Sequence, residues 1–112
     1  MDISSLTKDL EYKENGPAIK VLFENEASKE IRILMRKGQH MKEHKTAFPI
    51  VVEMFEGKLE FGVNGEVLSL VKGDLIALEG SVPHDLTASE DCIIRLSLSK
   101  KDDAQRVFNL VK

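Results

Sequence analysis

Three histidines, His40, His44 and His84, are the residues of this sequence best suited to chemistry. A neutral imidazole is the commonest protein ligand for transition metals, and it can also exchange a proton near neutral pH. The first two lie four residues apart in GQHMKEHKTAFPIVVEMFEG, and the third lies in EGSVPHDL, forty residues after His44. They can share one metal ion only if the fold returns the third histidine to the first two.

Short β-strands separated by turns are expected over most of the chain. The stretch KEIRILMRKG places Ile31, Ile33 and Met35 on one face, which is the period of a half-buried strand. Comparable runs are AIKVLFEN, IVVEMFEG, KLEFGV, VLSLVKGDLIALEG and DCIIRLSLS. The pair Asn64-Gly65 predicts a tight hairpin turn, because both residues tolerate positive φ. This pattern predicts an all-β sandwich or barrel.

Two segments are expected not to be strands. The stretch from His40 to His44 follows a glycine that ends a strand, and we interpret it as a loop. The C-terminal DDAQRVFNLVK has helical spacing after Asp102 or Asp103, and it predicts a short C-terminal helix that could pack on the barrel or on a partner.

Glycines and histidines recur at a characteristic spacing in two segments. Residues 38–57 begin and end with glycine, and five residues separate the first glycine from His44. Residues 73–88 begin with glycine and contain His84. These segments resemble the two motifs of the cupins, small jelly-roll β-barrels of the RmlC-like type. The resemblance implies a single cupin domain over residues 1–112, with a metal ion held inside the barrel by three histidines and a glutamate.

The ligand positions of the cupin motifs are only partly filled. Thr46 stands at the second histidine of the first motif, and Ile50 stands at its glutamate. The second motif departs from the pattern at Glu79, Ser81 and Ala88. Residue-by-residue transfer leaves His44 and His84 as ligands. We expect this pair to bind a divalent metal (Zn, Ni, Mn or Fe) weakly, because Ile50 removes the carboxylate that would offset the charge of the ion.

Other interpretations of the two motif histidines stay open. His40 could act as a third ligand if its loop turns inward. Met35 and Met54, on the inward faces of their strands, could join the histidines around Cu(I), which prefers soft ligands. Alternatively, the two imidazoles form a polar pair completed by Thr46 or a water molecule, because buried polar groups need partners.

Two other reactive groups are expected to have structural roles. Cys92 lies at an inward position of its strand and is interpreted as a small buried hydrophobic residue. His84 and Asp85 are neighbours on a strand, so they point to opposite faces and form no acid–base pair. Tyr12, the only tyrosine, lies outside both motifs.

The sequence favours a binding or structural module over an enzyme. The expected pocket suits a small, mostly apolar ligand, and it is lined by Met35, His44, Thr46, Ile50, Val52, Met54, Phe61, His84 and Ile94. The alternative is a metal-dependent cupin enzyme, a dioxygenase or isomerase, that uses His44 and His84. The isoleucine at the glutamate position favours the first hypothesis.

Composition bounds the partners. The net charge is −3 and the pI is about 5.6, which argues against non-specific nucleic-acid binding. No apolar run is long enough to cross a membrane, and a single cysteine fits a reducing compartment; we therefore expect a cytoplasmic protein. The outward side chains of Val51, Phe55 and Ile93 would be exposed in a monomer, so we expect a two-fold homodimer.

Overall fold

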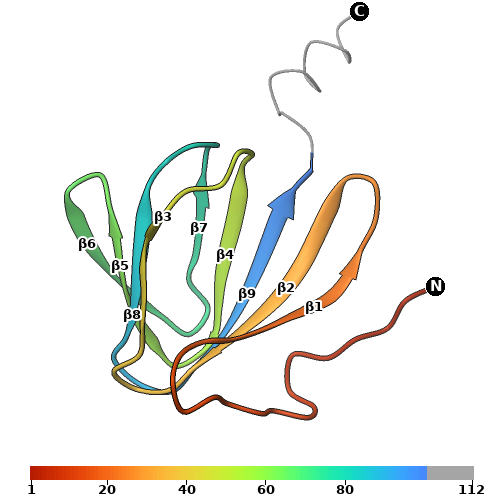
Figure 1. Cartoon of the computed structure of the whole chain (residues 1–112), viewed down its shortest axis with the longest axis horizontal. Helices are drawn as coiled ribbons and strands as arrows, with labels where there is room; N and C mark the ends of the chain where they lie inside the picture. Colours follow the sequence, from red (N-terminus) through yellow and green to blue (C-terminus); the bar gives the residue numbers. More distant parts are fainter. Residues whose placement is uncertain (101–112) are drawn as a thin grey trace, which may run out of the picture.

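The computed structural model describes residues 1–100, so the predicted C-terminal helix lies outside the described residues. Nine strands follow one another along the chain (Figure 1): β1 (Ala18–Glu24), β2 (Ser28–Met35), β3 (His40–His44), β4 (Ile50–Glu56), β5 (Lys58–Val63), β6 (Glu66–Val71), β7 (Leu75–Leu78), β8 (His84–Ala88) and β9 (Cys92–Ser99). The all-β prediction is confirmed for this part of the chain. None of its segments forms a helix able to cross a membrane.

The strands form two sheets that face each other. The five-stranded sheet has the order β1-β2-β9-β4-β7, and the four-stranded sheet has the order β3-β8-β5-β6 (Figure 1). All their pairings are antiparallel. The core between the sheets is made of apolar side chains from the inner faces, namely Ile31, Ile33, Met35, Ile50, Val52, Met54, Leu59, Phe61, Val63, Leu70, Leu86, Ala88, Cys92 and Ile94.

Period-two patterning in the sequence explains these inner faces. In β5, Leu59, Phe61 and Val63 are buried, while the residues between them are half-buried. The hairpin that follows turns at Asn64 and Gly65, whose φ values are 52° and 75°. Two successive positive φ angles match the right-handed twist of the flanking strands, so this turn is where the sequence predicted it.

The stretch from His40 to His44 is strand β3, and its prediction as a loop is wrong. It pairs with β8 through His40 opposite Thr87, Met41 opposite Leu86 and His44 opposite His84. Its side chains are mostly polar and exposed, so the sequence shows no alternation typical of a strand. The strand that supplies its hydrogen bonds is forty residues away in the sequence. The register shifts between Met41 and His44, where β3 contains one residue more than β8. This bulge turns both side chains toward the inner face.

The N-terminal segment lies over the outer face of the five-stranded sheet. The Arg32 guanidinium donates to the backbone carbonyls of Ser5 (3.2 Å), Lys8 (2.9 Å) and Asp9 (3.3 Å). Only 3% of Arg32 is exposed. On the same outer face Ile93 is 6% exposed, so the expectation that it is exposed in a monomer is wrong.

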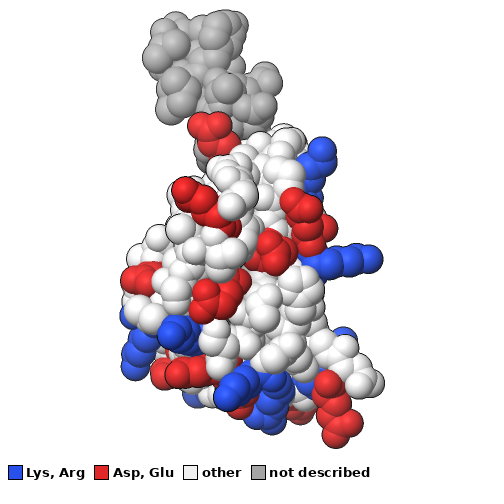
Figure 2. Space-filling model, turned by 90° about the vertical axis from the view of Figure 1, so that its left-hand side faces the viewer, with Lys and Arg blue, Asp and Glu red and all other residues white. Residues whose placement is uncertain are grey.

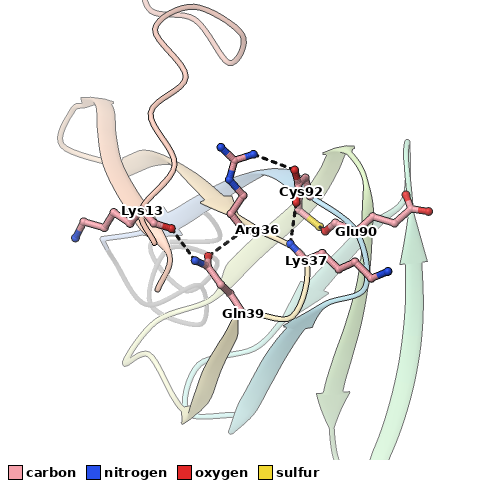
Figure 3. A network of polar contacts seen from close by, with 7 residues as sticks. Lys13, Arg36, Lys37, Gln39, Glu90 and Cys92 are labelled. Atoms are coloured by element: carbon pink, nitrogen blue, oxygen red, sulfur yellow. Dashed lines mark hydrogen bonds and ion pairs between the residues drawn. The ribbon is translucent and has the colours of Figure 1, made fainter. Parts of the chain in front are cut away.

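The loops at one end of β3 and β8 are joined by a dense polar network, which we call the closed end (Figure 3). Asp91 accepts hydrogen bonds from the backbone N–H of Lys37 (2.8 Å) and from the Arg36 guanidinium (3.0 Å). The Gln39 side chain accepts from the Arg36 backbone N–H (2.9 Å) and donates to the carbonyl of Lys13 (2.7 Å). Two loops and the N-terminal segment are therefore fixed to one another at this end.

Candidate functional site

His44 and His84 face each other at the opposite end of β3 and β8, which we call the barrel mouth. His44 ends β3, His84 begins β8, and the two are directly opposite in the ladder. Their ring centroids are 4.4 Å apart and the ring planes are inclined by 62°. His84 also stacks on Phe61, with centroids 5.6 Å apart and planes 7° from parallel. The fold thus brings together two residues forty positions apart in the sequence.

Backbone hydrogen bonds fix the tautomer of both rings. Nδ1 of His44 lies 2.9 Å from the carbonyl oxygen of Lys42, and Nδ1 of His84 lies 2.8 Å from that of Val82. A carbonyl can only accept, so in the neutral form of each ring Nδ1 carries the proton and Nε2 carries a lone pair. Within residues 1–100 neither Nε2 has a hydrogen-bond partner. Both rings are therefore held in place with one acceptor nitrogen available to a ligand.

Burial keeps His84 neutral. The residue is 4% exposed, and its pKa is lowered from the usual 6.5 mainly because burial disfavours the charged form. The nearby imidazole of His44 lowers this pKa further, while the hydrogen bond to Val82 and the charge of Asp85 act in the opposite direction. At neutral pH His84 is consequently an acceptor and not a cation.

A small cavity lies beside the two rings. Its volume is about 30 Å³, more than the roughly 10–15 Å³ that one water molecule needs. It accommodates a group of the size of a water molecule or a single ion. Apart from the two imidazoles its walls are aliphatic or thioether groups, and the lining residues are Ile33, Met41, His44, Val52, His84, Leu86, Ile94 and Leu96.

The other residues expected in the pocket are placed elsewhere. Met35, Ile50, Met54 and Phe61 belong to the closed core, and none is more than 2% exposed. The Thr46 hydroxyl donates to the carbonyl of Phe48 (2.9 Å) in the loop after β3, and Thr46 does not line the cavity. Val52 and Ile94 do line the cavity.

Met41 is the member of the cavity that sequence reasoning missed. It lies three residues before His44, and an odd spacing on a regular strand puts two side chains on opposite faces. The bulge in β3 cancels this alternation and places both against the same cavity. No local signal marks the bulge, because its evidence is the register with β8.

His40 points away from this site. It is opposite Thr87 in the ladder, and its Nδ1 lies 2.8 Å from the Thr87 hydroxyl on the outer face of the four-stranded sheet. His40 lines a different, more open cavity of about 430 Å³. The structure therefore separates it from the two motif histidines by the thickness of a sheet.

The outer cavity is flanked by acidic groups. Glu43, Glu66 and Asp85 line it together with His40, and the Asp85 carboxylate lies over Gly62, where a Cβ atom would collide with it. Figure 2 shows the side of the molecule where β5 and β6 lie, with acidic side chains predominant in the upper half of the view and basic ones in the lower half. As predicted, Asp85 and His84 occupy opposite faces of β8.

The divalent metal site that cupins imply does not fit the donors present at the barrel mouth. Among residues 1–100 no three His, Cys, Asp or Glu side chains gather closely enough to hold an ion. Ile50 occupies the glutamate position with a buried aliphatic side chain. Two neutral imidazoles in an apolar cavity lack the negative charge that stabilises a divalent cation away from water.

Comparisons with known proteins identify the fold. No protein-family model and no curated protein matches the sequence. An RmlC-like cupin from Desulfovibrio desulfuricans is 20% identical, with a TM-score of 0.81 over 88% of this chain and 96% of that one. A conserved Klebsiella pneumoniae protein with a double-stranded β-helix domain is 21% identical, with a TM-score of 0.78 over 91% of each chain.

A third solved structure, KdgF from Halomonas sp., is 18% identical, with a TM-score of 0.73 over 88% of this chain and 95% of that one. These likenesses span nearly the whole of each compared protein. The chain therefore has the fold of a small RmlC-like cupin.

Proposed function

We propose that this protein is a non-catalytic cupin barrel that binds a small ligand at the barrel mouth, between His44 and His84. The observation that carries the proposal is that His44 and His84 both line one cavity, while neither Nε2 has a hydrogen-bond partner within residues 1–100. His44 is exposed, and within residues 1–100 the only fully buried side-chain nitrogen without a partner is Arg32 Nε, so both histidine Nε2 atoms are open to solvent or to a ligand. A partner for these two nitrogens is most simply supplied from outside the chain.

The chemistry of the cavity restricts the ligand. Two unprotonated nitrogens accept hydrogen bonds or donate lone pairs, so the ligand brings a hydrogen-bond donor or a cation. The remaining walls are apolar, which is typical of sites that use a few polar groups to orient a ligand. With a volume of about 30 Å³ the cavity admits one small group, and anything larger must displace the exposed His44 side chain.

The alternative, a metal-dependent dioxygenase or isomerase using His44 and His84, is less well supported. Such chemistry needs an ion held firmly enough to retain open coordination positions for substrate. Within the described part of the chain the cavity offers neither a third imidazole nor a carboxylate. The donor set suits binding better than divalent-metal catalysis.

Nitrogen-15 spectra of the imidazole rings test the proposal directly. Untagged protein labelled at histidine is screened against small amines, alcohols and azoles. We expect binders to shift the Nε2 signals of His44 and His84 and to leave His40, the matched control on the outer face, unchanged. The proposal fails if no compound or cation shifts the two signals selectively, or if His84→Phe binds the same ligand as strongly as the wild type.

A two-fold homodimer and a cytoplasmic location stay predictions, and the structure offers a different surface for the dimer. Ile19 (57% exposed) and Val21 (46% exposed) lie on edge strand β1 opposite the core residues Ile33 and Ile31. They lie on the core-facing side of the five-stranded sheet, beyond the part that the four-stranded sheet covers. Sedimentation of the wild type as a monomer at micromolar concentration, or an unchanged dimer in Ile19→Lys, would contradict this surface.

A further inference from the structure

We propose that the ligand of the barrel mouth is Cu(I), held by Nε2 of His44, Nε2 of His84 and the thioether of Met41. This inference rests on the proposed function and names the chemical class of its ligand. It differs from the cupin metal set in its ion, in the absence of a carboxylate and in a ligand that neither cupin motif contains.

The bulge in β3 creates the three-residue set. Met41 is opposite Leu86 and His44 is opposite His84, with one extra residue on β3 between the two pairs. All three side chains line the same cavity. A regular strand would have put Met41 and His44 on opposite faces, so the irregularity is what adds sulfur to the two nitrogens.

The two imidazoles are prepared for a metal. Histidines that bind metals almost always donate their other ring N–H to a carbonyl or carboxylate, which fixes the tautomer and the orientation of the ring. His44 and His84 do so through the carbonyls of Lys42 and Val82. Stacking on Phe61 further restrains His84. Little side-chain ordering is therefore left for the ion to impose on this ring.

The donors select a soft, monovalent ion. Thioether and imidazole ligands suit Cu(I), whereas divalent ions such as Mn²⁺ prefer carboxylates. The cavity wall carries no formal negative charge, because its other residues are aliphatic. A single positive charge is less costly than two to place in such surroundings. The features that make the mouth unsuitable for the divalent cupin metal thus favour Cu(I).

Size and access agree with a single ion. The cavity of about 30 Å³ has room for one small group next to the rings. His44 is exposed while His84 is buried, so the ion can reach the outer imidazole first and then the inner one. An entry path of this kind is required of any functional metal site.

Anaerobic competition with bicinchoninate, a chromophoric chelator of Cu(I), measures the affinity of the untagged protein. We expect one Cu(I) per chain in the wild type. Met41→Leu conserves volume and should fold, yet it should bind at least about tenfold more weakly, since even outer-shell losses cost roughly 10–100-fold in metal affinity. Met35→Leu is the matched control, because this methionine is fully buried in the core and does not line the cavity.

X-ray absorption at the copper edge identifies the ligands. We expect a sulfur scatterer in the wild type and in Met35→Leu, and its loss in Met41→Leu. The inference is overturned if Met41→Leu binds as tightly as the wild type, if His84→Phe retains the stoichiometric ion, or if Zn²⁺ displaces Cu(I) from the mouth. His40→Phe should be without effect.

The copper result and the proposed function can fail separately. If Cu(I) does not bind but a small molecule shifts the Nε2 signals of His44 and His84, the copper inference alone falls. If neither Cu(I) nor any screened compound perturbs these nitrogens, both fall.

Discussion

The polar side chains at the two ends of strands β3 and β8 differ in how many of their hydrogen bonds are made within the chain. At the closed end, the side chains of Asp91 and Gln39 make hydrogen bonds that tie separate segments together (Figure 3). At the barrel mouth, His44 and His84 each use one nitrogen to fix the ring and leave the other without a partner in the described chain. The polar groups of the closed end find their hydrogen-bond partners within the described chain. The two histidine Nε2 atoms at the barrel mouth have no such partner and are available to a ligand.

Glycine packing at the closed end gives the largest expected effect. Gly57 has φ = 94°, and a Cβ there would collide with the Asp91 carbonyl and lie 2.9 Å from Cα of Cys92. We expect Gly57→Ala to lower the free energy of unfolding by about 3 kcal/mol or more, from backbone strain plus overpacking. Urea denaturation measures the loss.

Gly65→Ala is the matched control for this prediction. Gly65 also has a positive φ of 75°, but no atom lies within 4 Å of its would-be Cβ. Only strain applies there, and we expect a loss of about 1 kcal/mol. Equal losses in the two variants would show that the close approach of the Asp91 carbonyl to Gly57 adds nothing to the cost of backbone strain.

The two ends should respond to acid in different pH windows. His84 has a pKa below its unfolded value, so the unfolded chain takes up its proton first and stability falls as pH drops below about 6.5. Asp91 has a pKa lowered by the hydrogen bonds from Lys37 and Arg36, so its contribution is present above about pH 4 and is lost below it.

Unfolding measured from pH 8 to pH 3 separates these contributions. We expect His84→Leu to flatten the decline near pH 6.5 and Asp91→Asn to flatten the decline below pH 4. His44→Phe should leave most of the first decline, because burial is the main cause of the His84 shift. If the decline near pH 6.5 persists in His84→Leu, His84 is not the group that causes it.

Cys92 should show the smallest effect. Burial raises the pKa of its thiol to about 11, and the sulfur lies 3.1 Å from the carbonyls of Lys58 and Glu90. The thiolate is the nucleophile, so we expect iodoacetamide at pH 8 to label native protein far more slowly than urea-unfolded protein, as mass spectrometry would record. Labelling at similar rates in both states would show that the fold does not protect the Cys92 thiol.

Local patterning was enough to predict much of the fold. Alternation of Ile31, Ile33 and Met35 indicated the inner face of β2, and Asn64-Gly65 indicated the hairpin turn between β5 and β6. The motif glycines and histidines indicated a cupin, which the solved structures confirm as the fold. These features depend on a few neighbouring residues, so the sequence shows them directly.

The pairing of distant strands could not be read in the same way. The faces on which His40 and Met41 lie are determined by the register of β3 against β8. The register sends His40 outward to Thr87, and the bulge turns Met41 inward beside His44. Sequence spacing predicts the opposite for Met41, because regular alternation fails wherever one strand has an extra residue.

The sequence by itself determined the donors that the barrel mouth could have. It supplies two motif histidines, replaces the cupin glutamate by Ile50, and provides no further cysteine beyond Cys92. Only the tertiary structure decided which groups meet: it joined His44 to His84, added Met41, and closed the core over Met35 and Met54. The reason is physical, because residue types fix what a site can bind, while strand register and burial fix which side chains reach it.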